Sequence, residues 1–205
     1  MKRLLFLVSI CDIMCGGEFE TFLTVLQCNE KNKTKGKEMK PRSKITLYTT
    51  RGALIAALYV ILTELSTLIG LSSGVIQFRI SEALCILPIF FPEAIPGLFI
   101  GCIISNLMVP GVVIWDIVFG SLATLIGAVG ARLLMKLPER LKWMATLPTI
   151  LANMIIVPLV LIYAYGAPDS YPFLMLTVGV GEIVCAGAGG SGLYYLLRRY
   201  DGRLF

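Results

Sequence analysis

The sequence predicts an all-α membrane protein that folds as a compact bundle of six transmembrane helices, with both termini in the cytoplasm. Its mean hydropathy is +0.82, and 57% of its 205 residues are hydrophobic while only 15% are charged. Soluble domains carry about 25% charged residues, so this composition indicates a membrane protein. Apolar runs recur from residue 52 onward, and each approaches the roughly 20 residues with which a helix crosses a bilayer.

The apolar runs define six predicted spans along the chain. They cover residues 52–70, 77–92, 95–110, 113–135, 145–165 and 174–196. The second and third spans are short, and only Pro92, Glu93 and Ala94 separate them, so their boundaries are the least defined. The spans belong to one membrane domain, residues 39–205.

Basic residues orient these spans. They gather before the first span, between the fourth and fifth, and after the sixth: Lys40, Arg42, Lys44 and Arg51; Lys136, Arg140 and Lys142; Arg198, Arg199 and Arg203. With six spans the three clusters fall on one side, which the positive-inside rule makes cytoplasmic. The net charge of +5 is therefore an orientation signal, and it does not indicate nucleic-acid binding.

Polar residues within the apolar spans predict a binding site. A charge near the bilayer centre costs about 2.5–3.5 kcal/mol, so charges retained there usually serve a function. In the predicted orientation these residues fall in the outer half of the membrane, whereas the inner half is mainly apolar. The expected pocket therefore opens outward, and its candidate residues are Glu64, Gln77, Arg79, Glu82, Asn106, Asp116 and Glu182, with Asn153 and Phe78 as further candidates.

Some of these charged residues also fit structural roles. Asp116, in the first turn of its helix, would complement the helix dipole. Arg79 and Glu82 lie three residues apart and would neutralise each other. Glu64 would lie at the level of the outer headgroups. The sequence leaves both alternatives open for each of them.

For Asn106, Asn153 and Glu182 the structural alternatives are not equally good. Asn106 and Asn153 would form hydrogen bonds between helices, which is the more usual role for Asn153. Glu182 is flanked by Gly179 and Gly181 and has no basic neighbour nearby in its own helix. A structural role explains it least well, so it is the main candidate for a ligand contact.

Four motifs within residues 51–200 resemble the QueT family, the substrate-binding S components of energy-coupling factor (ECF) transporters associated with queuosine precursors. They are QFRISEAL at residues 77–84, AIPGLFIG at 94–101, DIVFGSLAT at 116–124 and GVGE at 179–182. The first motif is specific because it places several polar residues in an apolar context. The glycine-rich motifs alone are weak signals.

This resemblance implies a function and a set of partners. S components are six-helix proteins of the bacterial plasma membrane that bind a vitamin-like molecule near the outer side. They associate with a transmembrane coupling subunit (EcfT-like) and two cytoplasmic ATPases, so the chain is expected to be the binding subunit of an ABC importer. The resemblance also implies that Ala53 and Ala57 dock the coupling subunit, although their spacing alone favours ordinary internal packing.

The ligand implied by the resemblance is a deazaguanine such as 7-aminomethyl-7-deazaguanine. Its N–H donors would pair with a carboxylate, its carbonyl would accept from Arg79 or Asn106, and its ammonium group would need a second acid. Phe78 would stack on the ring, although an aromatic at helical spacing more often belongs to the core. The sequence does not choose between the aminomethyl base, the nitrile and queuine.

Missing motifs narrow the function class. The sequence has no Walker-type G-x-x-x-x-G-K-[ST] motif, so ATP would be used by partner subunits and no cofactor is expected on this chain. It has no histidine, which removes the usual triads and His-ligated metal sites, so an enzyme is not expected. The alternative function is a self-sufficient ion-coupled carrier or channel, for which an inverted repeat would be typical.

Residues 1–38 are predicted to be a non-structural leader or a mis-assigned start. Lys2 and Arg3 precede an apolar run as in a signal peptide, but no cleavage site follows. A spanning anchor there would leave the lysine-rich stretch that follows it outside, against the positive-inside rule. The residues before Met39 instead correspond to purine-rich codons that resemble a ribosome-binding site.

Overall fold

The computed structural model describes residues 41–70, 77–109 and 111–204. The chain divides into two units, one of residues 48–199 and one of residues 1–47 with 200–205. The helices of residues 48–199 form the first unit. The predicted leader, residues 1–38, lies outside the described residues.

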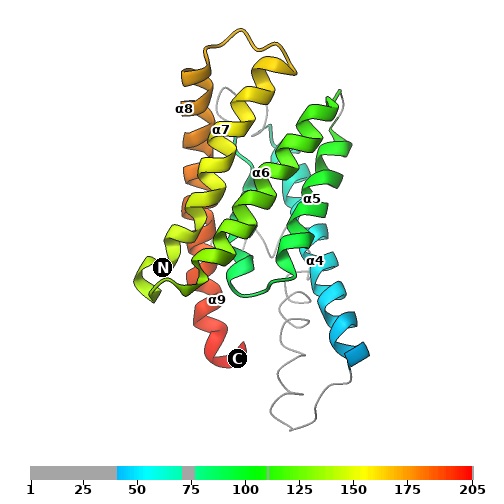
Figure 1. The fold of residues 1–205 in the computed structure, drawn as a ribbon, viewed down its shortest axis with the longest axis vertical. Coiled ribbons are helices and arrows are strands. Elements are labelled where there is room, and N and C mark those ends of the chain that lie inside the picture. Colours follow the sequence, from blue (N-terminus) through cyan, green and yellow to red (C-terminus); the bar gives the residue numbers. More distant parts are fainter. Residues whose placement is uncertain (1–40, 71–76, 110, 205) are drawn as a thin grey trace. The chain divides into compact units, whose positions relative to one another are not determined.

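Every regular element in the described residues is a helix (Figure 1). In chain order they are α4 (Pro41–Leu68), η1 (Ile80–Ile89), α5 (Ala94–Met108), α6 (Ile114–Leu133), η2 (Leu134–Lys136), η3 (Glu139–Thr146), α7 (Leu147–Tyr163), α8 (Tyr171–Glu182), η4 (Ile183–Gly189) and α9 (Gly190–Leu204). The elements η1, η2 and η3 are 3₁₀ helices, and η4 is a π-helix that joins α8 to α9.

The apolar helices confirm an all-helical membrane protein. In the described residues, four helical stretches are long and apolar enough to cross a membrane: 45–68, 114–136, 139–163 and 171–199. Two shorter apolar helices, 80–89 and 94–108, correspond to the second and third predicted spans. The number of membrane crossings, and the side of the membrane on which the termini lie, stay predictions.

The second predicted span, residues 77–92, differs most from its prediction. It contains a ten-residue 3₁₀ helix, η1, with Pro88 inside it, and residues 77–79 before it are irregular. Ten 3₁₀ residues extend about 20 Å, less than the roughly 30 Å of a hydrocarbon core.

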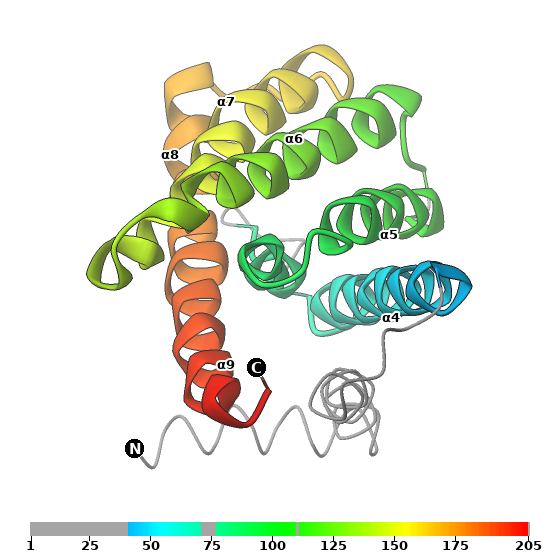
Figure 2. The same ribbon diagram turned by 60° about the horizontal axis from the view of Figure 1, so that its bottom comes forward.

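The short helix η1 lies at the centre of the unit. It packs against α5, α6 and η4, while α5, α6, α7 and α8 pack on one another in chain order around it (Figure 2). The side chains of Ile86 and Ile89 join Ala131, Ala145 and Tyr194 in one buried cluster. This placement sets the polar residues of the first motif inside the bundle.

One of the intramembrane charges has a structural explanation here. The Arg132 guanidinium, on α6, donates hydrogen bonds of 3.0 and 3.1 Å to the carbonyl oxygens of Pro88 and Ile89. These carbonyls are at the end of η1, where no further turn supplies an N–H donor. Arg132 therefore caps the central helix.

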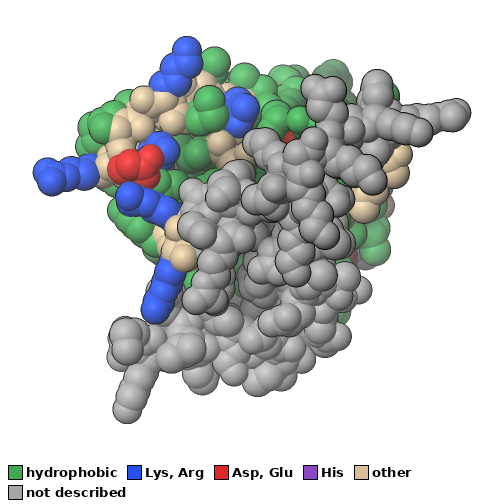
Figure 3. Space-filling view, turned by 90° about the horizontal axis from the view of Figure 1, so that it is seen from below, with side chains coloured by type: hydrophobic (Ala, Val, Ile, Leu, Met, Phe, Trp, Pro, Cys, Tyr) green, Lys and Arg blue, Asp and Glu red, His purple; other side chains and the backbone are tan. Residues whose placement is uncertain are grey.

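The end of the unit near Arg132 is basic. Tyr194 donates a 2.7 Å hydrogen bond to Glu139, Lys142 pairs with the same carboxylate, and Arg198 lies 3.3 Å from it. Figure 3 shows Lys and Arg side chains gathered around an acidic one at this end. Residues of the second and third basic clusters of the sequence thus meet in space.

Helices α4 and α5 approach each other closely because glycines face each other. A methyl group added at Gly97 would lie 2.6 Å from the carbonyl oxygen of Gly52, and one at Gly101 would lie 2.9 Å from that of Ala56. Neither carbonyl can move without displacing its helix. Small residues allow this kind of approach in membrane helices.

We expect Gly97→Ala to lower the melting temperature of the detergent-purified protein, because overpacking of this kind costs about 1–3 kcal/mol. Gly192→Ala is the matched control, since a methyl group there meets no atom within 4 Å and alanine favours a helix. Thermal unfolding by circular dichroism would compare them. Equal shifts for the two variants would contradict the role of the close approach.

Candidate functional site

A buried polar cluster lies where η1 meets α4, and Glu82 is its first member. The Glu82 side chain is 1% exposed. Tyr59 donates a 2.5 Å hydrogen bond to its Oε1, and the Cys85 thiol donates to Oε2 at 3.2 Å. Both oxygens of the Glu82 carboxyl group thus accept a hydrogen bond from the protein.

Arg79 connects η1 to α5. Its Nη2 donates a 2.6 Å hydrogen bond to Oδ1 of Asn106, which is fully buried near the end of α5. The Asn106 amide nitrogen lies 3.6 Å from the sulfur of Cys102, a weak acceptor. A methyl group at Gly120 would lie 3.0 Å from that nitrogen, so a glycine on α6 leaves room for it.

Glu182, at the end of α8, is the second buried acid. It is 6% exposed, and Asn153 on α7 forms a side-chain hydrogen bond with it. Its Oε2 is buried and has no hydrogen-bond partner among the described residues. Glu82 and Arg79 both lie close enough to interact with it electrostatically. Burying an ionised carboxylate that lacks a full set of hydrogen-bond partners costs several kcal/mol.

The backbone around Glu182 is also unusual. The seven-residue π-helix η4 begins at the next residue, Ile183. Such segments are rare and occur frequently at functional sites, because the extra residue per turn redirects nearby side chains. Gly179, three residues before Glu182, permits close packing here, since it faces the side chain of Met154.

Asp116 has a partner in a connecting loop. Tyr165, which follows α7, donates a 3.0 Å hydrogen bond to Asp116 Oδ2 and accepts a 3.3 Å one from the backbone N–H of Val113. Asp116 lies in the first turn of α6, as the structural alternative expected, and it also interacts electrostatically with Arg79. It therefore anchors a loop at the edge of the cluster.

The structure brings most of the predicted residues together and leaves three apart. Arg79, Glu82, Asn106, Asn153 and Glu182 belong to one buried cluster, with Asp116 at its edge. By contrast, Gln77 and Phe78 are half-buried in the irregular segment before η1, and Glu64 is half-buried with one unpartnered oxygen among the described residues. Among the described residues, no hydrogen bond or ion pair joins Gln77, Phe78 or Glu64 to the cluster.

Sequence reasoning missed the α4 side of the cluster. Beside Tyr59, Thr63 donates a 2.8 Å hydrogen bond to Ser81, and Ser66 accepts one of 3.2 Å from the backbone N–H of Ile80. Residues 59, 63 and 66 follow the helical period and so share one face of α4. Their spacing along the helix is the signal in the sequence that could have indicated these residues.

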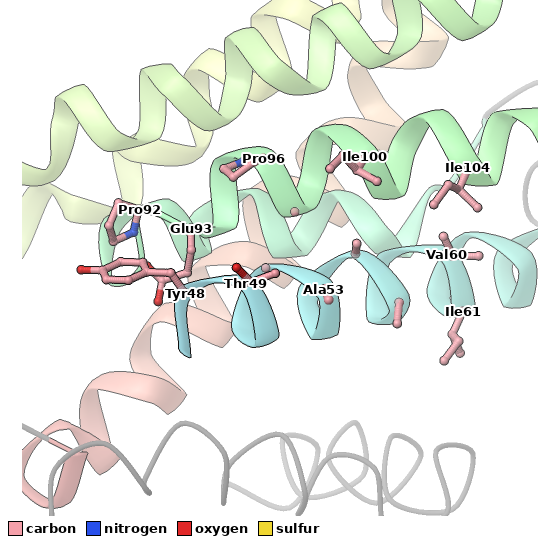
Figure 4. A pocket seen from close by; sticks show the side chains of 14 residues that line it. Tyr48, Thr49, Ala53, Val60, Ile61, Pro92, Glu93, Pro96, Ile100 and Ile104 are labelled. Carbon is pink, nitrogen blue, oxygen red and sulfur yellow. The ribbon is translucent and has the colours of Figure 1, made fainter. Parts of the chain in front are cut away.

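The predicted docking residues lie on a different face. Ala53 and Ala57 are exposed, and both line an apolar groove of about 980 Å³ between α4 and α5. Figure 4 shows Ala53 on α4, with Pro96, Ile100 and Ile104 on α5 across the groove. A second apolar groove of about 520 Å³ lies between α6 and α7. Because both alanines are exposed, the alternative of internal packing does not apply to them.

Among the residues that the structure describes, no group of three or more Cys, Asp or Glu side chains is arranged to hold a metal ion. The three cysteines within the described bundle, Cys85, Cys102 and Cys185, are buried and unpaired with one another. The cluster offers hydrogen bonding and charge: two buried acids, one guanidinium, two amides and several hydroxyl groups.

Comparisons with known proteins identify a family. The model of the QueT transporter family matches residues 49–199, which includes every member of the polar cluster. A curated relative, the queuosine precursor transporter QueT of Lactococcus lactis subsp. cremoris (strain MG1363), is 44% identical over 75 residues. That match spans 36% of this chain and 43% of the relative. No solved structure matches the chain.

Proposed function

This chain belongs to the QueT transporter family, and we propose that it is the substrate-binding S subunit of an ECF-type ABC importer. It captures a queuosine precursor of the 7-deazaguanine type from outside the cell. A coupling subunit and two ATPases complete the transporter and use the ATP. The relative's name supports the substrate, and the multi-pass apolar helices support a place in the bacterial plasma membrane.

The unpartnered oxygen of Glu182 is the observation that carries the proposal. It lies in a cluster that also holds an arginine and an asparagine amide, within an otherwise apolar bundle. A guanine-type edge has two parallel N–H donors that suit a carboxylate, and a carbonyl that suits Arg79 or Asn106. Glu82 is less available, because Tyr59 and Cys85 already donate to its two oxygens.

The groove between α4 and α5 supports docking of the coupling subunit. It is lined in part by small residues, Gly52, Ala53 and Ala57 among them, and its lining is almost wholly apolar. Small residues let a partner helix approach closely in a membrane, where packing contacts provide much of the association energy. Docking and ligand binding thus use separate faces of α4, since Tyr59 points into the polar cluster.

A ligand titration tests the proposal. We expect the detergent-purified chain to bind 7-aminomethyl-7-deazaguanine, 7-cyano-7-deazaguanine or queuine without any other subunit, and to bind guanine less well. Cells should take up the ligand only when a coupling subunit and the ATPases are also expressed. Uptake into proteoliposomes that contain this chain alone would contradict the S-subunit role, and failure to bind any deazapurine would contradict the substrate.

A further inference from the structure

The fixed charges of the buried cluster do not balance. Glu82 and Glu182 are both more than nine-tenths buried, whereas Arg79 is the one cation that interacts with them in the described part of the chain. Glu82 accepts a hydrogen bond on each of its oxygens, and Arg79 can balance one negative charge in the cluster. A second buried anion at Glu182 would have no cation of its own.

Apart from Arg79, the described groups around Glu182 carry no positive charge. From η1 it faces Glu82 and Cys85, from the segment before η1 it faces Arg79, and from η4 it faces Cys185. From α7 it meets the amide of Asn153. Within the described residues, its Oε2 has no hydrogen-bond partner at all. A buried carboxyl group with a like charge nearby and no cation of its own favours its neutral form.

We propose that Glu182 holds a proton in the ligand-free protein and releases it to solvent when a singly charged cationic ligand binds. The proton leaves the carboxyl group, the ligand's positive charge takes its place, and the cluster stays neutral. This inference rests on the proposed function in that it places the ligand in the cluster. It adds that the site recognises a cation, and that cation binding is coupled to a proton.

The coupling gives the two deazaguanine classes different pH dependences. Affinity for the ammonium compound, 7-aminomethyl-7-deazaguanine, should rise by about tenfold per pH unit while free Glu182 is protonated, because each binding event releases about one proton. Affinity for the neutral nitrile, 7-cyano-7-deazaguanine, should stay nearly constant, since it brings no charge to replace the proton and an edge N–H can donate to the carbonyl oxygen of the neutral acid.

Infrared spectroscopy tests the first half of the inference without any ligand. A protonated carboxylic acid has a C=O stretching band that a carboxylate lacks. We expect this band in the ligand-free protein at neutral pH and its loss in Glu182→Gln. Asp169→Asn is the control, because Asp169 is exposed in the loop between α7 and α8, and that variant should keep the band. A spectrum of the unaltered protein without the band would overturn the proposal, whatever the ligand.

Calorimetry on the unaltered protein tests the second half and requires no variant to fold. Titrations with 7-aminomethyl-7-deazaguanine in buffers of different ionisation enthalpy count the protons released. We expect about one for this ligand and about none for the nitrile. Tight binding of the ammonium compound without proton release would overturn the coupling and leave the transport function intact. If neither deazaguanine binds, the transport function fails, while the infrared result still decides the state of Glu182.

Discussion

Glu182→Gln is expected to weaken the binding of 7-aminomethyl-7-deazaguanine about ten- to a hundredfold. A hydrogen bond to a charged group contributes about 1.5–3 kcal/mol, and each 1.4 kcal/mol changes the dissociation constant tenfold. The substitution keeps the shape of the side chain, but it replaces one acceptor by a donor that opposes the ligand's N–H groups. It also removes the negative charge that would meet a cationic ligand.

The folded protein should persist in this variant, because a neutral amide is cheaper to bury than an acid with an unpartnered oxygen. Calorimetry on samples of matched monodispersity would compare the unaltered protein, Glu182→Gln and the loop variant Asp169→Asn. The loop variant should bind like the unaltered protein. An unchanged dissociation constant for Glu182→Gln would remove Glu182 from the pocket and leave Glu82 and Asp116 as the next acids to test.

Replacing Ala53 or Ala57 by Trp should abolish uptake while ligand affinity stays within about twofold of the unaltered value. Both alanines are exposed along the groove between α4 and α5, so an indole there holds a partner helix several ångströms away. The polar cluster lies on the opposite side of α4, where Tyr59 is fully buried, and it should be unaffected. Leucine at the same positions should give a weaker defect.

The control for this experiment is Val129→Trp, because Val129 is an exposed residue on α6 and does not line the groove. Uptake of labelled ligand would be measured in cells that contain the whole transporter, and binding would be measured on the purified chain. Copurification of the coupling subunit would show whether the complex forms. Loss of both uptake and binding, or loss of neither, would mean that this face does not dock the partner.

Much of the fold could be predicted because hydropathy acts locally. A bilayer requires each crossing segment to satisfy its own backbone hydrogen bonds, so long apolar runs become helices almost regardless of their neighbours. The helices α6, α7 and the joined α8–α9 follow from their apolar runs in this way. The family could be identified as well, since motifs such as residues 77–84 place polar residues in an apolar setting.

The second apolar run shows where that reasoning stops. Residues 77–92 are apolar enough to predict a span, yet they form the ten-residue 3₁₀ helix η1 at the centre of the bundle. Its end is capped by Arg132, which lies 43 residues away from Ile89 along the chain. Hydropathy cannot distinguish a segment buried among helices from one that faces lipid, since both are apolar.

The sequence by itself therefore determined the class, the helical segments, the family and most of the acids and amides that meet in the membrane. Only the tertiary structure decided which partners each acid has. Tyr59 comes from 23 residues before Glu82 to occupy one of its oxygens, whereas Glu182 keeps an open oxygen near the same arginine. The physical reason is that a buried charge depends on every group within a few ångströms, and packing brings those groups from distant parts of the chain.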